Sequence, residues 1–404
     1  MSYGISYFRL KTSERYCAIV DNDSKLPIFY PNLFVTTQTR NKNHSFSTMI
    51  STAKCLVVLL KFLKERNIDI IERIHSKKFL AIFELDDLRD FTQKKFDSKY
   101  EEQSKVKRIS EIKYVTSETE YLRLTIIYKY IEWLALHVTV SNDDSFSEAL
   151  SACINGIKSR RPVKKGRNDI LNPKSLTDDK IEDLLEVVRI NSPKNPFMRS
   201  LQSRNRLIIL MLYFLGVRAG ELLNIRISDI DFSSNQLKIL RRADEKGDYR
   251  LKQPLVKTNE RIIPIKDNLI KEIYDYILNE RSKLTKKKKH DYLFVRHKSG
   301  AEQGLPLNYS AYAKVISTIK NVLPNLSSLT GHMLRHTWNV DFSKRMDSLE
   351  NPPSEERQEK MRSYLMGWKE GSGTASHYNK RFLEEKAHEA ALQLQNEITL
   401  IIKK

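Results

Sequence analysis

Five side chains in the second half of the chain could together break a phosphodiester bond: Arg218, Lys257, His332, Arg335 and Tyr378. Arginines bind the non-bridging oxygens of a phosphate and stabilise the extra charge of a five-coordinate phosphorus. A lysine can protonate a leaving alkoxide, and a histidine can accept the proton of the nucleophile. A tyrosine can attack phosphorus and form a covalent phosphotyrosine, but its unperturbed pKa of about 10 means that it needs cationic neighbours. This chemistry requires no metal ion or other cofactor, so we expect none.

The first arginine follows a buried helix. The segment "NRLIILMLYFLG" is apolar on every face and ends at Gly216. Arg218 comes next on a tight turn, and a new helix is expected near Gly220, with Glu221 in its first turn. A structural ion pair between Arg218 and Glu221 explains this motif equally well when it is taken alone.

The other candidates are also ambiguous when each is taken alone. Lys257, in "QPLVKTNERIIPI", is predicted at a hairpin tip, where an ordinary exposed lysine is common. His332 and Arg335 are three residues apart and would share a helical face, where they could hold one phosphate. A histidine that caps a helix is the alternative for His332, and His336 is expected to be structural.

The order of these motifs makes them specific, because it resembles the catalytic domain of the tyrosine recombinases, also called the phage integrase family. The matching stretches are "LTDDKIEDLL", "GVRAGELLNIRISDID", "KTNERIIPI", "GHMLRHTW" and "MGWKEGSGTASHY". The resemblance covers about residues 174–382. The segment 45–155 resembles the core-binding domain of that family only in pattern and position.

The resemblance implies a role for each matching residue. Arg218 and Arg335 would bind the scissile phosphate, Lys257 would be the general acid for the 5′ oxygen, His332 would assist proton transfer, Glu221 would brace Arg218, and Tyr378 would be the nucleophile that forms a 3′-phosphotyrosine. Trp368 stands where most members have histidine, so a positioning role is expected there. A second departure is "RMDSLENPPSEERQEKM" (345–361), which is expected to be an inserted acidic loop.

The elements that must position these residues predict a mainly α-helical fold with a small β-sheet in the catalytic domain. Residues 1–44 alternate apolar and polar positions, which indicates a few strands or an extended arm. Residues 45–157 are expected to form a helical core-binding domain, 158–175 a basic linker, and 176–404 a mixed α/β, mostly helical catalytic domain.

Local signals refine this outline. In the helical domain, a helix is expected around "FELDDLRDFTQKKF", and another begins at Ser117, where Glu120 completes a capping box. In the catalytic domain, Thr177 is expected to cap the first helix. The stretches "NQLKIL" and "ERIIPI" are predicted as strands, and "DYLFVR" (291–296) as a further possible strand.

The charge of the chain points to a polyanionic partner. The 404 residues carry 70 Lys and Arg against 50 Asp and Glu, a formal net charge of +20. Nucleic acid is the commonest such partner, and a ribosome-associated or membrane-surface protein is the alternative. The linker is basic and is expected to be a solvated loop that also lies along DNA phosphates; its candidate contacts are Arg160, Arg161, Lys164, Lys165 and Arg167.

Other features favour the cytoplasm, at the nucleoid of a bacterium. The N-terminus has no apolar signal-peptide core, and the longest apolar run (207–217) is about half of what a membrane span needs, so no membrane partner is expected. The three cysteines, Cys17, Cys55 and Cys153, are far apart and are expected to be buried, reduced thiols.

The leading hypothesis is a site-specific DNA recombinase of a mobile element, whose two domains clamp duplex DNA. Alternatives are a type IB topoisomerase-like or hairpin-forming enzyme with the same residues, a DNA-binding protein without catalysis, and a basic scaffold or RNA-binding protein. A C-terminal stripe (Ala387, Ala390, Ala391, Leu394, Ile398 and Ile401) could pack on its own domain. Family resemblance favours exchange of this helix within a DNA-bound homo-tetramer. A directionality factor is a further possible partner.

Overall fold

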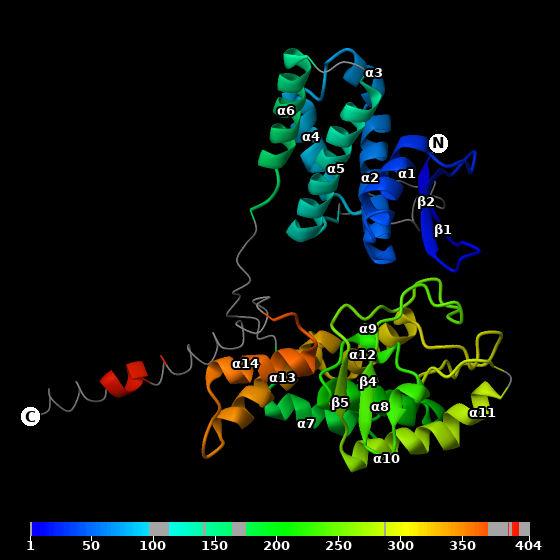
Figure 1. The fold of residues 1–404 in the computed structure, drawn as a ribbon, viewed down its shortest axis with the longest axis vertical. Helices are drawn as coiled ribbons and strands as arrows, with labels where there is room; N and C mark the ends of the chain where they lie inside the picture. The colour runs from blue at the N-terminus through cyan, green and yellow to red at the C-terminus, as the bar shows by residue number, and fades with distance from the viewer. Residues whose placement is uncertain are drawn as a thin grey trace, which may run out of the picture. The chain divides into compact units, whose positions relative to one another are not determined.

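The chain folds into two compact units, unit 1 (Met1–Asn168) and unit 2 (Asp169–Lys404). The structure, a computed structural model, describes residues 2–96, 113–139, 143–163, 175–286, 288–370, 387 and 390–395. Figure 1 shows each unit as a body of helices with a small sheet, and the prediction of a mainly helical fold is confirmed.

Unit 1 contains one hairpin and a set of helices. Its elements are β1 (Tyr3–Arg9), β2 (Arg15–Asp21), α1 (Phe29–Val35), a π-helical turn η1 (Thr36–Arg40), α2 (Phe46–Glu65), α3 (Ile70–His75), α4 (Ile82–Gln93), α5 (Ser117–Val138) and α6 (Asp144–Ser159). Helix α4 lies where a helix was expected around 83–96. The long helices α2 and α5 contact each other, and α6 packs on α5.

The first 44 residues are part of the core of unit 1 and do not form an independent arm. The antiparallel pair β1–β2 buries Cys17 and Ile19, and α1 buries Phe34, in the same hydrophobic cluster as Leu56 and Leu59 of α2. A two-stranded hairpin is marginal by itself, so packing on α2 supplies the stability that the alternating pattern could not reveal.

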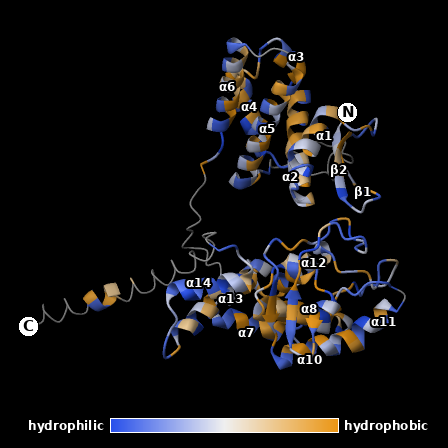
Figure 2. Cartoon of the chain, viewed as in Figure 1, coloured by the Kyte–Doolittle hydropathy of each residue, from blue (hydrophilic) through white to orange (hydrophobic). Residues whose placement is uncertain are grey.

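Helix α2 is long and apolar enough, by length and composition, to cross a membrane, and it is the one such helix in the described part of the chain. Leu56, Leu59 and Phe62 on it are fully buried in the core of unit 1. Figure 2 shows α2 as a largely hydrophobic helix.

The start of α5 differs from the predicted capping box. The N-cap is Thr116, whose hydroxyl accepts a hydrogen bond from the Thr119 amide at 3.4 Å, and Ser117 is already helical. Glu120 is used elsewhere, because its carboxylate accepts a hydrogen bond from Gln93 at 3.2 Å. The threonine one position earlier therefore takes the role that was assigned to Ser117.

The linker was predicted to span residues 158–175, but in the structure it begins later than residue 158. Helix α6 runs to Ser159, and Arg160 forms its C-cap, with its guanidinium 2.6 Å from Asp86 of α4. Arg161 stacks over the rings of Tyr121 and Tyr128 of α5. Arg160 and Arg161 thus make contacts inside unit 1, while Lys164, Lys165 and Arg167 lie outside the described residues.

Unit 2 combines helices with a three-stranded antiparallel sheet of order β3-β4-β5. Its elements are α7 (Asp178–Val187), α8 (Arg199–Phe214), α9 (Ala219–Leu222), η2 (Ile227–Asp229), β3 (Ile230–Asp231), β4 (Gln236–Ile239), β5 (Arg261–Pro264), α10 (Asp267–Tyr276), η3 (Ile277–Arg281), α11 (Ser282–Thr285), α12 (Tyr309–Val322), η4 (Pro324–Leu326), α13 (Gly331–Asp347) and α14 (Glu355–Met366).

Strands β4 and β5 occupy the two stretches expected to be strands, and they pair in the register Leu237 to Ile263. They are joined by the long loop 240–260 and not by a tight hairpin, so Lys257 lies near the end of this loop and not at a hairpin tip. The possible strand 291–296 is absent from the described structure; only single bridges, at Tyr292 and Val295, occur there.

Helix α8 is the centre of the unit 2 core. Ile208, Ile209, Met211 and Leu212 are all fully buried on it, as the apolar run that begins at Leu207 predicts, and Figure 2 shows the same region as strongly hydrophobic. The helix ends at Phe214, and the chain turns through Gly216 at a φ of +59°, a conformation that favours glycine.

Residues 345–361 were expected to form an inserted acidic loop, but most of them are helical. Helix α13 continues to Asp347 and α14 begins at Glu355, so only the residues between them form a loop. Figure 1 shows α13 and α14 side by side. Ser354 caps α14, because its hydroxyl accepts a hydrogen bond from the Arg357 amide, and the two glutamates that follow favour the positive end of the helix dipole.

Part of the C-terminal stripe is described. Residues 387 and 390–395 are helical and exposed, and they include Ala387, Ala390, Ala391 and Leu394. Ile398 and Ile401 lie outside the described residues.

Candidate active site

The centre of the candidate site is the buried carboxylate of Glu221. Arg218 is the N-cap of the short helix α9, and its backbone N–H donates to Glu221 Oε2 at 3.1 Å, so Glu221 is held in the first turn as expected. The Arg218 guanidinium is 3.5 Å from Glu221 Oε1. Two further arginines approach Oε2: Arg261 at 2.7 Å and Arg335 at 3.9 Å.

These neighbours decide the ionisation of Glu221. Burial of the carboxylate would raise its pKa, but the positive charges of Arg261 and Arg335 and the hydrogen bonds from Arg261 and Thr258 outweigh burial, so its pKa lies below the ordinary value. One carboxylate thus faces three guanidinium groups, and the cluster keeps an excess of positive charge. Such a buried excess is a setting for an anionic ligand.

Arg335 connects three parts of unit 2. It lies on α13, and its guanidinium donates to the carbonyl of Gly216, after α8, and to the carbonyl of Met366, at the end of α14, each at 2.7 Å. Only 1% of its side chain is exposed, against 31% for Arg218. Arg218 is therefore the more accessible of the two arginines predicted to bind phosphate.

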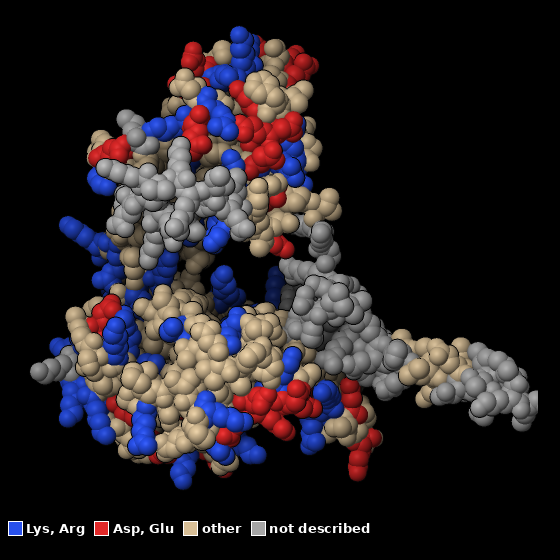
Figure 3. Space-filling model, turned by 180° about the vertical axis from the view of Figure 1, so that it is seen from behind, with Lys and Arg blue, Asp and Glu red and all other residues tan. Residues whose placement is uncertain are grey.

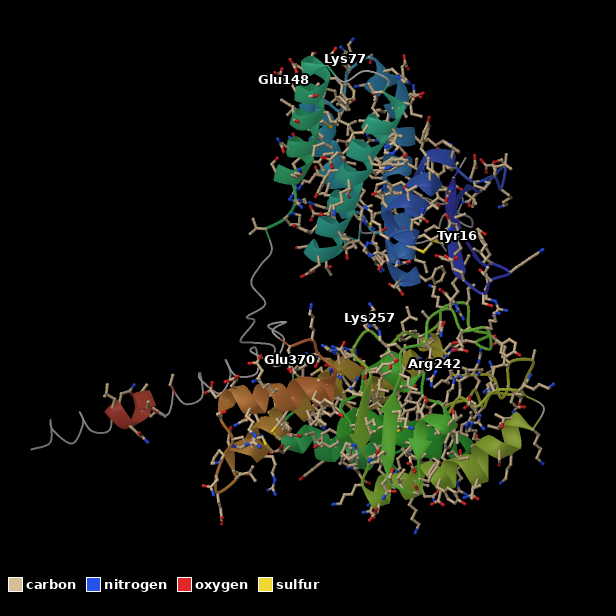
Figure 4. All side chains as sticks on the ribbon, viewed as in Figure 1. Tyr16, Lys77, Glu148, Arg242, Lys257 and Glu370 are labelled. Atoms are coloured by element: carbon tan, nitrogen blue, oxygen red, sulfur yellow. The ribbon has the colours of Figure 1, made fainter. Side chains whose placement is uncertain are left out.

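Lys257 is exposed, and Figure 4 shows it on the surface of unit 2. Its neighbour Thr258 is buried and donates from its hydroxyl to Glu221 Oε1 at 2.6 Å. The next residue, Asn259, donates from its backbone N–H to the carbonyl of Gly367 at 2.9 Å. The segment that carries the lysine is thus attached both to the arginine cluster and to the end of α14.

The turn after α14 is shaped to fit this segment. Gly367 has a φ of +64°, and a Cβ there would lie 2.7 Å from Arg261 Nη1 and 2.8 Å from the carbonyl oxygen of Asn259. Only glycine combines that backbone conformation with such close contact. The turn delivers Trp368, whose ring lies under the Arg335 guanidinium at 5.5 Å from the ring centroid.

His332 lies in the first turn of α13, one turn before Arg335, as the spacing predicted. The helix is capped by Thr330, whose hydroxyl accepts from the Met333 amide at 3.2 Å, so His332 is not the cap. Its ring contacts that of His336 edge to face, with centroids 4.4 Å apart. His336, expected to be structural, is thus a direct neighbour of His332.

The structure therefore brings together Arg218, Glu221, Arg335, Trp368 and the segment that carries Lys257. Tyr378 and His377 lie outside the described residues. Sequence reasoning missed Thr258 and Arg261. A signal for Arg261 was present, because an arginine facing the core from a strand with apolar alternation requires a buried carboxylate. Within the described ranges, no group of three His, Cys, Asp or Glu residues is placed to hold a metal ion.

Comparison with known proteins places this site in a family. Residues 174–349 match the phage integrase family. The chain is 32% identical over 166 residues to tyrosine recombinase XerD of Halalkalibacterium halodurans, a match that covers 41% of this chain and 47% of that protein. It is 26% identical over 230 residues to transposase A from transposon Tn554 of Staphylococcus aureus, covering 54% of this chain and 59% of that protein. The chain thus spans about half the length of the curated relatives it matches.

A solved structure agrees with the fold. The Tn1549 transposon integrase in complex with circular intermediate DNA superposes with a TM-score of 0.50 over 86% of this chain and 94% of that chain, at 15% identity. The match of residues 174–349 includes the Arg218–Glu221–Arg335 cluster, the lysine segment and the H-x-x-R helix. The chain therefore carries a phage integrase family domain over residues 174–349, and its sequence is similar to that of tyrosine recombinases.

Proposed function

We propose that this chain is a site-specific DNA recombinase that cuts and rejoins duplex DNA through a covalent 3′-phosphotyrosine on Tyr378. The observation that carries the proposal is the convergence of three distant segments on Glu221: the turn of Arg218, the segment of Lys257 and the helix of Arg335. Ordinary stability does not require three arginines around one buried carboxylate, because burying charges is costly.

The cleavage step follows from the roles of these residues. The Tyr378 oxygen attacks phosphorus while His332 accepts the phenol proton. The bond between phosphorus and the 5′ oxygen breaks, and Lys257 donates a proton to that oxygen. Rejoining is the reverse reaction with a 5′-hydroxyl from another strand. Because the phosphotyrosine conserves the bond energy, neither ATP nor a metal ion enters this scheme.

Arg218 and Arg335 would have different roles at the scissile phosphate. Arg218, the more exposed, makes the first contact with the scissile phosphate, and the deeper Arg335 stabilises the five-coordinate phosphorus while holding the ends of α8 and α14. Trp368 orients Arg335 through its ring. Glu221 keeps the guanidinium groups from repelling one another.

The partners and the biological role belong to the same proposal. The partner is duplex DNA at specific sites. The Tn1549 integrase, whose fold is similar, forms a complex with circular intermediate DNA, and the net charge of +20 on this chain favours such a partner. Integration or excision of a mobile element is the favoured role, since transposase A belongs to a transposon. On DNA, the chain would form a homo-tetramer whose protomers exchange C-terminal helices. A directionality factor would be a further partner. The reaction would take place in the cytoplasm, at the nucleoid.

The experiment is to trap protein on DNA. Wild type and Tyr378→Phe are incubated with fragmented genomic DNA of the source organism and denatured, and the covalently retained DNA is sequenced. The proposal predicts that wild type retains fragments with one shared cleavage site and that Tyr378→Phe retains none. Equal retention by both proteins would contradict it. Retention without a shared site, together with relaxation of any supercoiled plasmid, would indicate a topoisomerase.

A further inference from the structure

Arg261 connects three of the segments that meet at the candidate site: helix α9, the segment that carries Lys257, and the end of α14. Its Nη2 donates to Glu221 Oε2 at 2.7 Å, its Nη1 to the hydroxyl of Thr258 at 3.0 Å, and its Nε to the carbonyl of Leu365 at 2.7 Å. Only 1% of its side chain is exposed. A guanidinium with all three nitrogens engaged in fixed directions is a rigid connector, because its donors form a planar fork.

The hydroxyl of Thr258 completes the connection. It accepts from Arg261 and donates to Glu221 Oε1, at 3.0 Å and 2.6 Å, so both of its partners are set by the arginine cluster. Thr258 follows Lys257 directly in the chain. Its orientation therefore limits where the backbone of Lys257 can lie relative to Arg218 and Arg335.

We propose that Arg261 and Thr258 are positioning residues for Lys257: together they hold the lysine backbone in register with the phosphate-binding arginines and so control delivery of the proton to the leaving 5′ oxygen. This inference rests on the proposed function. Both residues are buried and act through Lys257. A displacement of about 1 Å in a reacting group can cost on the order of a hundredfold in rate.

A simple structural role is the competing explanation, since breaking any buried ion pair destabilises a protein. The positioning role and the purely structural role differ in whether a leaving group that needs no proton restores the cleavage rate of a variant. A residue that serves proton delivery becomes unimportant when the leaving group needs no proton. A residue that only stabilises the fold is needed equally whatever the leaving group.

The test uses duplex oligonucleotides that carry the cleavage site recovered by sequencing, with either oxygen or sulfur at the bridging 5′ position. Thiols ionise near pH 8.5, so a thiolate leaves without protonation. Single-turnover cleavage is measured for full-length wild type, Lys257→Met, Thr258→Val, Arg261→Met and Arg261→Lys. Arg204→Met is the matched control, because Arg204 is also buried but donates to Asn205 and to the carbonyl of Val295.

On oxygen-bridged DNA we expect Thr258→Val and Arg261→Met to cleave on the order of 10- to 100-fold more slowly than wild type, and Arg261→Lys to recover part of the loss. On sulfur-bridged DNA, the cleavage rates of Thr258→Val, Arg261→Met and Lys257→Met should come within about threefold of the wild-type rate. Arg204→Met should show the same ratio to wild type on both substrates.

Equal losses on both substrates for Thr258→Val and Arg261→Met, with Lys257→Met rescued by sulfur, would overturn the positioning role while leaving the proposed function intact. If Arg261→Met does not fold, Thr258→Val decides the question, because it leaves the pair of Arg261 with Glu221 in place. Absence of cleavage of either substrate by wild type would instead refute the proposed function, and the positioning role with it.

Discussion

Arg218 and Glu221 form an ion pair, but that pair alone does not explain the motif. The two side chains are 3.5 Å apart, whereas Arg261 and the Thr258 hydroxyl lie closer to the same carboxylate, at 2.7 Å and 2.6 Å. Glu221 therefore organises a cluster and does more than brace one arginine. Loss of its charge should affect the fold as well as the chemistry.

Glu221→Gln should be strongly destabilising. Removing the buried negative charge leaves the guanidinium groups without their partner and should lower the free energy of unfolding by about 3–5 kcal/mol at pH 7. The measurement is urea unfolding followed by circular dichroism. A loss below about 1 kcal/mol would contradict the central place assigned to this carboxylate.

The pH dependence of the same variant follows from the lowered pKa of Glu221. A carboxylate whose pKa is lower in the folded chain stabilises the fold above its ordinary pKa of 4.5, and this contribution is lost as the pH falls through the folded value. The difference in unfolding free energy between wild type and Glu221→Gln should therefore shrink on acidification from pH 7 to pH 3. A constant difference would contradict the assignment.

The sequence was sufficient to identify Arg218, Glu221, His332 and Arg335 as candidates, because each belongs to a local motif. It was not sufficient for Arg261, whose partners Glu221 and Leu365 are 40 and 104 residues away. Local patterns do not encode which distant carboxylate a strand arginine meets. The same limit explains why the contacts of Arg160 with Asp86 and of Arg161 with Tyr121 were not foreseen from the sequence.

At the scale of elements, the ends of two helices are held by side chains from elsewhere in unit 2. The carbonyl of Phe214 accepts from Trp338 Nε1 and that of Gly216 from Arg335. The carbonyls of Leu365 and Met366 accept from Arg261 and Arg335. Free carbonyls at a helix C-terminus attract positive charge, so the ends of α8 and α14 themselves help to fix the arginines.

Gly367→Ala tests the turn after α14. The added methyl group would collide with Arg261 and Asn259, and the φ of +64° disfavours any side chain. We expect a loss of about 1–3 kcal/mol in unfolding free energy together with slower DNA cleavage. Gly247→Ala is the control, because nothing lies within 4 Å of a Cβ at that position, and it should be close to wild type. Equal behaviour of the two variants would contradict the role of this turn.

His297 fastens α8 to α10, since its Nδ1 contacts the carbonyl of Ser200 at 2.8 Å and its Nε2 the hydroxyl of Tyr276 at 3.3 Å. Burial, with the nearby charge of Arg204, lowers the pKa of His297 to about 4. The neutral ring fits these partners: Nδ1–H donates to Ser200, and Nε2 accepts from Tyr276. The unfolded chain therefore binds one more proton than the folded chain between pH 4 and the ordinary pKa of 6.5.

From that difference, the stability of wild type should fall by up to about 3 kcal/mol as the pH is lowered from 6.5 to 4. His297→Gln should lose this part of the pH dependence, and His44→Gln, at an exposed position, should keep it. Urea midpoints across this pH range provide the measurement. Parallel curves for wild type and His297→Gln would contradict the buried neutral state.

Element identity was predicted better than element connection. The strands β4 and β5 and the helices α7, α8, α13 and part of α4 lie where local sequence signals predicted them. Lys257 was expected at a hairpin tip, but it lies near the end of the loop 240–260. In this loop, buried Arg250 binds Asp248 and the carbonyls of Leu223 and Leu307, and the sequence does not show these contacts. Those contacts depend on the assembled fold.

At the scale of the whole molecule, charge and domain structure bear on the proposed binding of DNA. The chain carries a net charge of +20, and Figure 3 shows Lys and Arg side chains over the visible surfaces of both units. Each unit has its own hydrophobic core. Phosphate contacts should therefore supply most of the affinity for duplex DNA and little of its sequence preference.

Salt dependence tests this expectation. For about 6–10 phosphate contacts, the affinity for non-cognate duplex DNA should fall roughly 10³- to 10⁵-fold between 50 and 200 mM salt. Fluorescence anisotropy with a labelled duplex measures the Kd at each salt concentration. A Kd that changes less than about tenfold over this range would contradict a mainly electrostatic mode of binding.

The most direct test of the central claim is to locate the covalent bond. Wild-type protein trapped on its cleavage site is digested with protease and nuclease, and the adduct is mapped by mass spectrometry, while parallel reactions use strands labelled at the 5′ or the 3′ end. Cleavage through a 3′-phosphotyrosine predicts a nucleotide adduct on the peptide that contains Tyr378 and retention of the 5′ label. An adduct on another residue, or retention of the 3′ label, would contradict it.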